Sequence, residues 1–291
     1  MLNLPSPNKS KRNMLFIYGS HSSIERWWGV AQELNKYGPL VMPDLPGLGG
    51  MTPMYKIGRQ PNLDNMADYL AAFIKLKYRN KNITLVGMSL GFTIATRMLQ
   101  KYPELVKKVD LLVSVVGFAH KDDFVWTRRR HMVYLTASRF FSLKWPSIFF
   151  KHTALQPAVL RGGYHKTHNA RNKFAEVSGD ELERSMEAEI ELWKINDIRT
   201  QFKHYVEILT LDNTTVPVKL PVHHVAVKND HFFDNIRVEQ HMRQIFSDFH
   251  IYHSKMSSHA PTVMASAKDA APLIPEGMRK MLKKKPGSNK V

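Results

Sequence analysis

The chain contains 291 residues, of which 43% are hydrophobic, and it has no cysteine. This length and apolar content allow one large α/β domain, or two smaller ones, with a substantial buried core. The lack of cysteine excludes disulfides, zinc–thiolate sites and a cysteine nucleophile, and it fits a cytoplasmic protein. No apolar run is long enough to span a membrane, and the polar residues 1–12, followed by a short apolar run, argue against a secretory signal peptide.

The formal net charge of +17 raises the question of anionic partners. Residues 276–291 carry +5 and predict a flexible basic tail, and residues 1–12 predict a flexible N-terminal segment. The tail is compatible with weak contact to an anionic membrane surface, although a solvated, disordered end is the simpler explanation. No basic stripe interleaved with aromatic residues precedes the tail, so no nucleic-acid partner is expected.

Apolar runs separated by amphipathic stretches predict alternating strands and helices over residues 13–117. The expected strands cover residues 14–18, 40–43, 83–86 and 109–117, and the expected helices cover residues 24–37, 63–79 and the stretch after Ser89. Strands that alternate with helices in this order predict an α/β fold: a mostly parallel, doubly wound sheet with helices on both faces.

The alternation stops at residue 118, and two long helical patterns follow, over residues 128–145 and 180–209. Strand patterns return at residues 222–227 and 249–254. We therefore predict a core domain of residues 13–117 and 221–275, interrupted by a helical cap of residues 118–220.

The stretch "ITLVGMSLGF" places Ser89 between Gly87 and Gly91, where the third of these strands turns into a helix. Such a corner strains its central residue, and glycines on either side remove the Cβ atoms that would collide. The helix terminus also offers free backbone N–H groups beside the serine. Taken alone, G-x-S-x-G equally fits an ordinary turn with a capping serine.

The wider arrangement resembles the α/β-hydrolase fold family, in which a serine, an acid and a histidine each follow a strand in that order. "KNDHFFDN" offers Asp230 after one predicted strand, and "KMSSHAPT" offers His259 after the next. Upstream, "YGSHSSIERW" is similar to the family's H-G-x₇-W segment, with Tyr18 where histidine is usual. "DLPGLGGM" is similar to its D-x-P-G-x-G turn.

The resemblance implies a role for each of these residues. Ser89 would be the nucleophile, His259 its general base, and Asp230 the acid that orients the imidazole. The backbone N–H groups of Ser20 and Leu90 would form the oxyanion hole. Close packing around the serine would depend on small residues in the motifs, namely Gly19, Gly87 and Gly91.

Other residues compete for the role of the acid. Asp234 lies in the same loop as Asp230 but further from the strand end, and some family members place the acid one strand earlier, which points to Asp122 or Asp123. The spacing of His165 and His168 is compatible with a metal ligand pair, but no carboxylate or cysteine lies near them in the sequence, so no metal is expected.

These features predict a serine hydrolase without a cofactor that cleaves a small-molecule carboxylic ester with a moderately apolar acyl group. An acyltransferase of the same fold, or a non-catalytic ligand-binding or scaffold protein, is the alternative. The aromatic stretch of residues 139–152 in the cap has two interpretations: an acyl-pocket or lipid-interface segment, or, more commonly, the cap's own core. The sequence does not indicate an oligomeric state.

Overall fold

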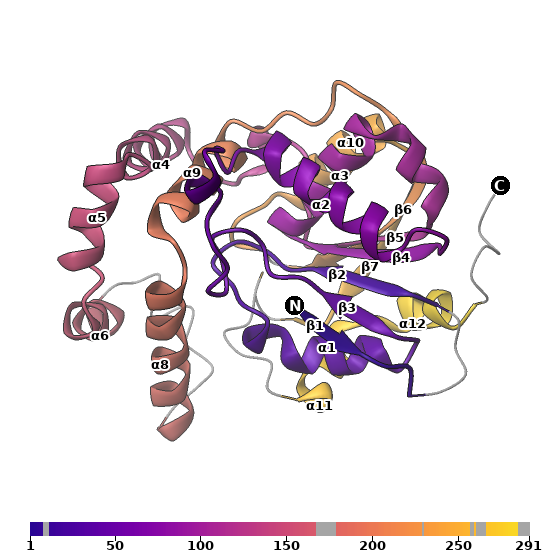
Figure 1. Ribbon diagram of the computed structural model, residues 1–291, viewed down its shortest axis with the longest axis horizontal. Helices are drawn as coiled ribbons and strands as arrows, with labels where there is room; N and C mark the ends of the chain where they lie inside the picture. The colour runs from indigo at the N-terminus through magenta and orange to yellow at the C-terminus, as the bar shows by residue number, and fades with distance from the viewer. Residues whose placement is uncertain (8–11, 167–178, 229, 257–258, 260–265, 285–291) are drawn as a thin grey trace.

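The computed structural model describes residues 1–7, 12–166, 179–228, 230–256, 259 and 266–284 (Figure 1). Its seven strands form one sheet in the order β1-β3-β2-β4-β5-β6-β7. β1 pairs antiparallel with β3, and all other neighbours are parallel, which confirms the predicted mostly parallel α/β sheet. The strands are β1 (Leu2–Leu4), β2 (Met14–Ile17), β3 (Leu40–Met42), β4 (Ile83–Met88), β5 (Val109–Val115), β6 (Val218–Val227) and β7 (Phe246–Ser254).

The central strands explain why the sheet is covered on both faces. Every residue of β2, β3 and β4 is buried, as expected for parallel strands packed between two layers of helices. β7, by contrast, is an edge strand with several exposed residues. The hydrophobic core therefore runs along both faces of the sheet.

Two helical layers flank the sheet. α2, α3 and α10 cover one face, and α1, α11 and α12 cover the other (Figure 1). Their bounds are α1 (Trp28–Asn35), α2 (Leu63–Lys77), α3 (Leu90–Lys101), α10 (Asn235–Ile245), α11 (Ala267–Ala270) and α12 (Glu276–Lys283). The first helix is shorter than predicted because a 3₁₀ turn, Glu25–Trp27, precedes it.

The remaining helices form the cap, which stands to one side of the sheet (Figure 1). They are α4 (Arg128–Phe141), α5 (Lys144–His152), α6 (Pro157–Lys166), α8 (Asp180–Ile195) and α9 (Ile198–Leu209). Of the helices described, none is long and apolar enough to cross a membrane.

The predicted helix over residues 180–209 is broken where the cap meets the core. Asp197 caps a new helix, α9, by accepting the N–H of Thr200 at 2.7 Å, and its own N–H donates to the carbonyl of Gly47. The neighbouring Asn196 accepts the N–H of Gly49 through its side-chain oxygen at 2.8 Å. The glycine-rich turn after β3 is therefore a docking point for the cap.

The prediction of a flexible N-terminal segment is wrong for its described residues. Leu2–Leu4 form β1 on the sheet edge. Arg12 is buried, where its Nη1 donates to Thr84 Oγ1 at 2.7 Å and lies 3.6 Å from Asp110 Oδ1. The buried carboxylate of Asp110 therefore compensates the charge of Arg12. Because the two residues are 98 positions apart, no local sequence pattern predicts this pair.

The predicted flexible basic tail begins, in the structure, with the helix α12. Met278 and Leu282 are buried at helical spacing against the core, and the Lys284 carbonyl accepts a hydrogen bond from Arg12 Nη2 at 2.6 Å. The high positive charge of residues 276–291 led to the prediction of a flexible tail, although the apolar spacing of Met278 and Leu282 was present in the sequence. Residues 285–291 lie outside the described residues.

Candidate active site

Ser89 sits at the sharp corner between β4 and α3. Its φ of 48° and ψ of −120° form a conformation that residues with a side chain rarely adopt. A Cβ on Gly87 would lie 2.5 Å from Phe92 Cα, and one on Gly91 would lie 2.3 Å from the Ile17 carbonyl oxygen. Both glycines are needed for space, since α3 packs directly against the strand ends. The corner is thus built to hold one strained serine.

Three loops bring a serine, a histidine and an aspartate together. His259 Nε2 lies 3.2 Å from Ser89 Oγ, and His259 Nδ1 lies 2.7 Å from Asp230 Oδ2. The side chains of Asp230 and His259 are 3% and 10% exposed. The loops follow β4, β6 and β7, whose carboxyl ends share one edge of the sheet. The result is a continuous hydrogen-bonded chain from carboxylate to hydroxyl, within the range expected of an activated nucleophile.

The surroundings of Asp230 keep it ionised. Burial alone would raise the pKa of this carboxyl, but the hydrogen bond and charge of His259 outweigh it, helped by the backbone N–H groups of Phe232 and Phe233. The pKa therefore lies below its usual value. An ionised Asp230 accepts a proton-bearing Nδ1, which leaves Nε2 of His259 facing Ser89 as an acceptor.

Two backbone N–H groups flank the serine. A Cβ on Gly19 would lie 3.2 Å from Ser89 Cβ, so the loop after β2 passes beside the hydroxyl. Leu90 opens α3, where an N–H has no partner within the helix. Among the residues described, no acceptor is bonded to the N–H of Leu90 or of Ser20. Both amides are available to an oxygen near Ser89.

Gln201, on α9 of the cap, is a site residue that the sequence analysis missed. The side chain is fully buried, its Nε2 donates to Ser20 Oγ at 2.7 Å, and its Oε1 accepts the N–H of His21 at 3.1 Å. The cap thereby holds the loop that carries one of the two amides. A faint signal was present, because Gln201 and His204 are polar residues on the buried face of an amphipathic helix.

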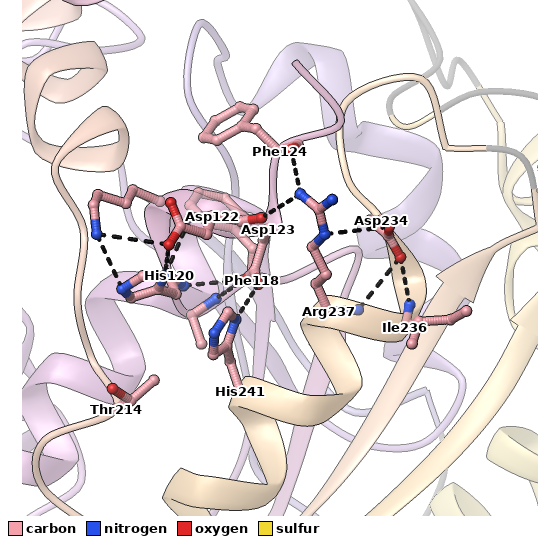
Figure 2. A network of polar contacts seen from close by, with 12 residues as sticks. Phe118, His120, Asp122, Asp123, Phe124, Thr214, Asp234, Ile236, Arg237 and His241 are labelled. Atoms are coloured by element: carbon pink, nitrogen blue, oxygen red, sulfur yellow. Dashed lines mark hydrogen bonds and ion pairs between the residues drawn. The ribbon is translucent and has the colours of Figure 1, made fainter. Parts of the chain in front are cut away.

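The competing acids are engaged elsewhere (Figure 2). Asp234 caps α10 by accepting the N–H groups of Ile236 and Arg237. Asp122 has a side chain that is 66% exposed. Asp123 is buried and pairs with a histidine of α10. Among the described residues, none of the three is hydrogen-bonded to His259.

Tyr18, which stands where the family usually has histidine, joins two loops through its hydroxyl. Its hydroxyl donates to Asp44 Oδ1 at 3.1 Å and accepts the N–H of Leu45 at 3.0 Å. Burial, reinforced by the charge of Asp44, raises the pKa of this hydroxyl well above its usual value, so it stays neutral. Tyr18 therefore ties the two upstream motifs to each other. The pair His165 and His168 lies outside the residues whose side chains are described.

An open apolar pocket of about 510 Å³ lies among the cap helices. Aromatic and aliphatic side chains from five cap helices line it, among them Tyr134, Phe141, Phe150, Leu160, Trp193 and Phe202. The Trp193 ring lies 4.1 Å from the ring of His21, next to Ser20. The pocket wall thus adjoins the loop that Gln201 holds.

Comparison with known proteins gives a consistent result. A family described as alpha/beta hydrolase fold matches residues 12–255. The pimeloyl-[acyl-carrier protein] methyl ester esterase of Nitrosomonas europaea is 29% identical over 113 residues, which cover 39% of this chain and 40% of that protein. The first curated relatives are matched over only 20% to 40% of their own lengths.

Two solved structures share the whole fold. The esterase from Exiguobacterium antarcticum superposes with a TM-score of 0.69 at 14% identity, covering 97% of this chain and 94% of its own. A bromoperoxidase from Bacillus anthracis also gives 0.69, at 13% identity and with the same coverage. Because the two carry different activities in their names, this likeness shows the fold alone.

Proposed function

The chain belongs to the α/β-hydrolase family, and on that premise we propose that it is a serine hydrolase that cleaves a carboxylic ester. The observation that supports this most is the hydrogen-bonded chain from Asp230 through His259 to Ser89. Two unbonded amides beside the serine, at Ser20 and Leu90, complete the set of groups that acyl transfer requires.

The first half of the reaction forms an acyl-enzyme. Ser89 Oγ attacks the ester carbonyl carbon while His259 Nε2 takes the hydroxyl proton. The negative charge of Asp230 stabilises the imidazolium and keeps it in the productive orientation. When the tetrahedral intermediate collapses, the bond to the alkoxide breaks and His259 delivers the proton to the leaving oxygen.

The second half repeats these steps with water. His259 removes a proton from water, whose oxygen attacks the acyl carbon, and the proton then returns to Ser89 as the acid leaves. In both halves the carbonyl oxygen becomes negatively charged in the tetrahedral intermediate, and the N–H groups of Ser20 and Leu90 donate hydrogen bonds to it. One such donor typically contributes about 10²- to 10³-fold in rate.

The cap supports a moderately apolar acyl group as the substrate class. Its open pocket of about 510 Å³ has an aromatic and aliphatic lining, and Trp193 brings its wall to the loop that bears Ser20. The partial match to an esterase that acts on a methyl ester agrees with an ester rather than another acyl compound.

Labelling with a fluorophosphonate probe tests the nucleophile directly. We expect the wild-type protein to be labelled and Ser89→Ala and His259→Ala to lose the label. A series of p-nitrophenyl esters of increasing chain length then tests the acyl group. Equal labelling of wild type and Ser89→Ala would refute the proposal, and so would labelling without hydrolysis of any ester in the series.

A further inference from the structure

We propose that the cap docks on the surface of an anionic phospholipid bilayer. The contact surface, here called the outer cap face, consists of five apolar residues with three cations among them: Phe140, Leu143, Trp145, Ile148, Phe149, Arg139, Lys144 and Lys151. α5 carries most of it and lies far from the sheet, at the outer side of the cap (Figure 1).

The outer cap face exposes large apolar side chains to an unusual degree. Trp145 is 74% exposed and Phe149 69%, while Phe140 and Leu143 are each 55% exposed. Their neighbours turn inward: the Phe141 ring lies 4.4 Å from that of Phe150. Core packing therefore explains only the inner half of this aromatic stretch. The outer half needs another partner, because contiguous exposed apolar side chains typically mark an interaction site.

The charge around these side chains is positive, and no ion pair within the described residues offsets it. Residues 124–175 contain ten Lys and Arg and no Asp or Glu. Six of these cations belong to α4 and α5, and within the described chain none of the six forms an ion pair with a carboxylate. On the core, by contrast, Lys75, Arg97 and Lys101 are each paired with an acidic side chain.

The combination of exposed apolar side chains and nearby cations favours a lipid surface over an acidic protein as the partner. On α5, Trp145, Ile148 and Phe149 follow helical spacing and form one apolar stripe, and Lys144 lies with its Nζ 5.4 Å from the Trp145 ring centre. A helix of this kind inserts its apolar side among the acyl chains while its cations remain at the anionic headgroups. Apolar insertion plus a basic patch also supplies the two contributions that stable membrane attachment needs.

Vesicle flotation with the full-length protein tests the proposal. We expect binding to phosphatidylcholine vesicles that contain phosphatidylglycerol, and weak or no binding to phosphatidylcholine alone. The double variant Trp145→Ala/Phe149→Ala should bind at least about 10-fold more weakly. Reversing two charges, in Lys144→Glu/Lys151→Glu, should weaken binding by about 10-fold or more and reduce its dependence on salt.

Matched variants on the core control for general effects. Ile57→Ala/Leu76→Ala removes two side chains that are 71% and 84% exposed, and Lys56→Glu/Lys77→Glu makes the same change in net charge. Both should bind like the wild type. Ser89→Ala should also bind normally, so failure of the proposed hydrolysis and failure of this proposal are separate results.

A second measurement does not depend on truncated side chains. Brominated anionic lipid should quench the tryptophan fluorescence of the wild type, and Trp145→Phe should lose most of that quenching. Absence of binding to anionic vesicles, or binding that both cap variants retain, would overturn the proposal. Binding to neutral vesicles with equal affinity would do so too. Binding to polyglutamate but not to vesicles would indicate an acidic protein partner instead.

Discussion

Two buried aspartates in this protein each hold a histidine, yet only one of the pairs reaches the serine. Asp230 accepts the N–H groups of Phe232 and Phe233 and bonds to His259. Asp123 accepts two backbone N–H groups, at 2.8 and 3.0 Å, and bonds to His241. Burial and hydrogen bonding are thus alike in the two pairs. The difference lies in what faces the far side of each imidazole.

The second pair is a support for the first. The His241 ring packs on His120, with ring centres 4.5 Å apart, rather than on a nucleophile (Figure 2). The Asp123 carbonyl accepts the N–H of Asp234, and the N–H of Val125 donates to the Phe232 carbonyl. The segment around Asp123 therefore anchors the loop that carries Asp230. A carboxylate–imidazole pair can act in catalysis only when the imidazole also faces a nucleophile, as His259 faces Ser89.

Replacing each aspartate by asparagine should separate these roles. Asp230→Asn should lower kcat by about 10⁴-fold, because His259 then loses its correct tautomer. Asp123→Asn should destabilise the protein by about 1–3 kcal/mol through its buried hydrogen bonds, while each folded molecule keeps most of its activity. Ester hydrolysis and urea unfolding, measured on the same samples, compare the two. A larger kcat loss in Asp123→Asn would reverse the assignment.

Gln201 offers a test of positioning without a change in any reacting group. Gln201→Leu should reduce kcat by about 10-fold or more, up to the contribution of one oxyanion donor, because the loop of Ser20 loses its anchor. KM should change less than kcat, and Gln201→Glu, which still accepts the N–H of His21, should recover part of the rate. If KM instead rose by about 10-fold while kcat stayed unchanged, Gln201 would contribute only to substrate binding.

Two buried histidines outside the proposed triad, His204 and His224, should destabilise the protein on acidification. Burial, reinforced by Lys203, lowers the pKa of His204 to about 4, and burial also lowers that of His224 to about 4. Below the unfolded pKa near 6.5 the unfolded chain binds more protons than the native one. The free energy of unfolding should therefore fall from about pH 6.5 toward pH 4. Urea unfolding across this range should show a shallower slope for His204→Gln, and an unchanged slope would contradict the assignment.

The smallest expected effect distinguishes Asp234 from its neighbour. Asp234→Ala removes the N-terminal cap of α10 and should cost about 1 kcal/mol in the free energy of unfolding. Its kcat should stay close to that of the wild type, in contrast to Asp230→Asn. Should the kinetic loss match that of Asp230→Asn, Asp234 would have to be considered as the acid.

The sheet and the candidate site residues could be predicted because their signals are local. The turn at Ser89 needs glycines within two residues of it, and the loops of Asp230 and His259 each follow an apolar run directly. Parallel strands then bring their carboxyl ends to one edge. The resemblance to the α/β-hydrolase family suggested which residues these loops carry, and the parallel topology explains why the three loops lie together.

Features that depend on distant partners escaped prediction. Gln201 meets Ser20 across 181 positions, and Arg12 meets Lys284 across 272. No local pattern encodes such contacts. In α12, the spacing of Met278 and Leu282 was visible but the excess of lysine dominated the interpretation. The choice between inner and outer aromatic residues of the cap likewise required the packing of α4 and α5 against α9.

The hydrogen bonds of Gln201 couple the position of the cap to that of the Ser20 loop, which carries one of the two proposed oxyanion-hole amides. A cap that lifts to admit a substrate must first break the hydrogen bonds from Gln201 to Ser20 and His21. Entry and turnover would then be mutually exclusive, since the raised cap leaves the loop unbraced and only a reseated cap braces it again.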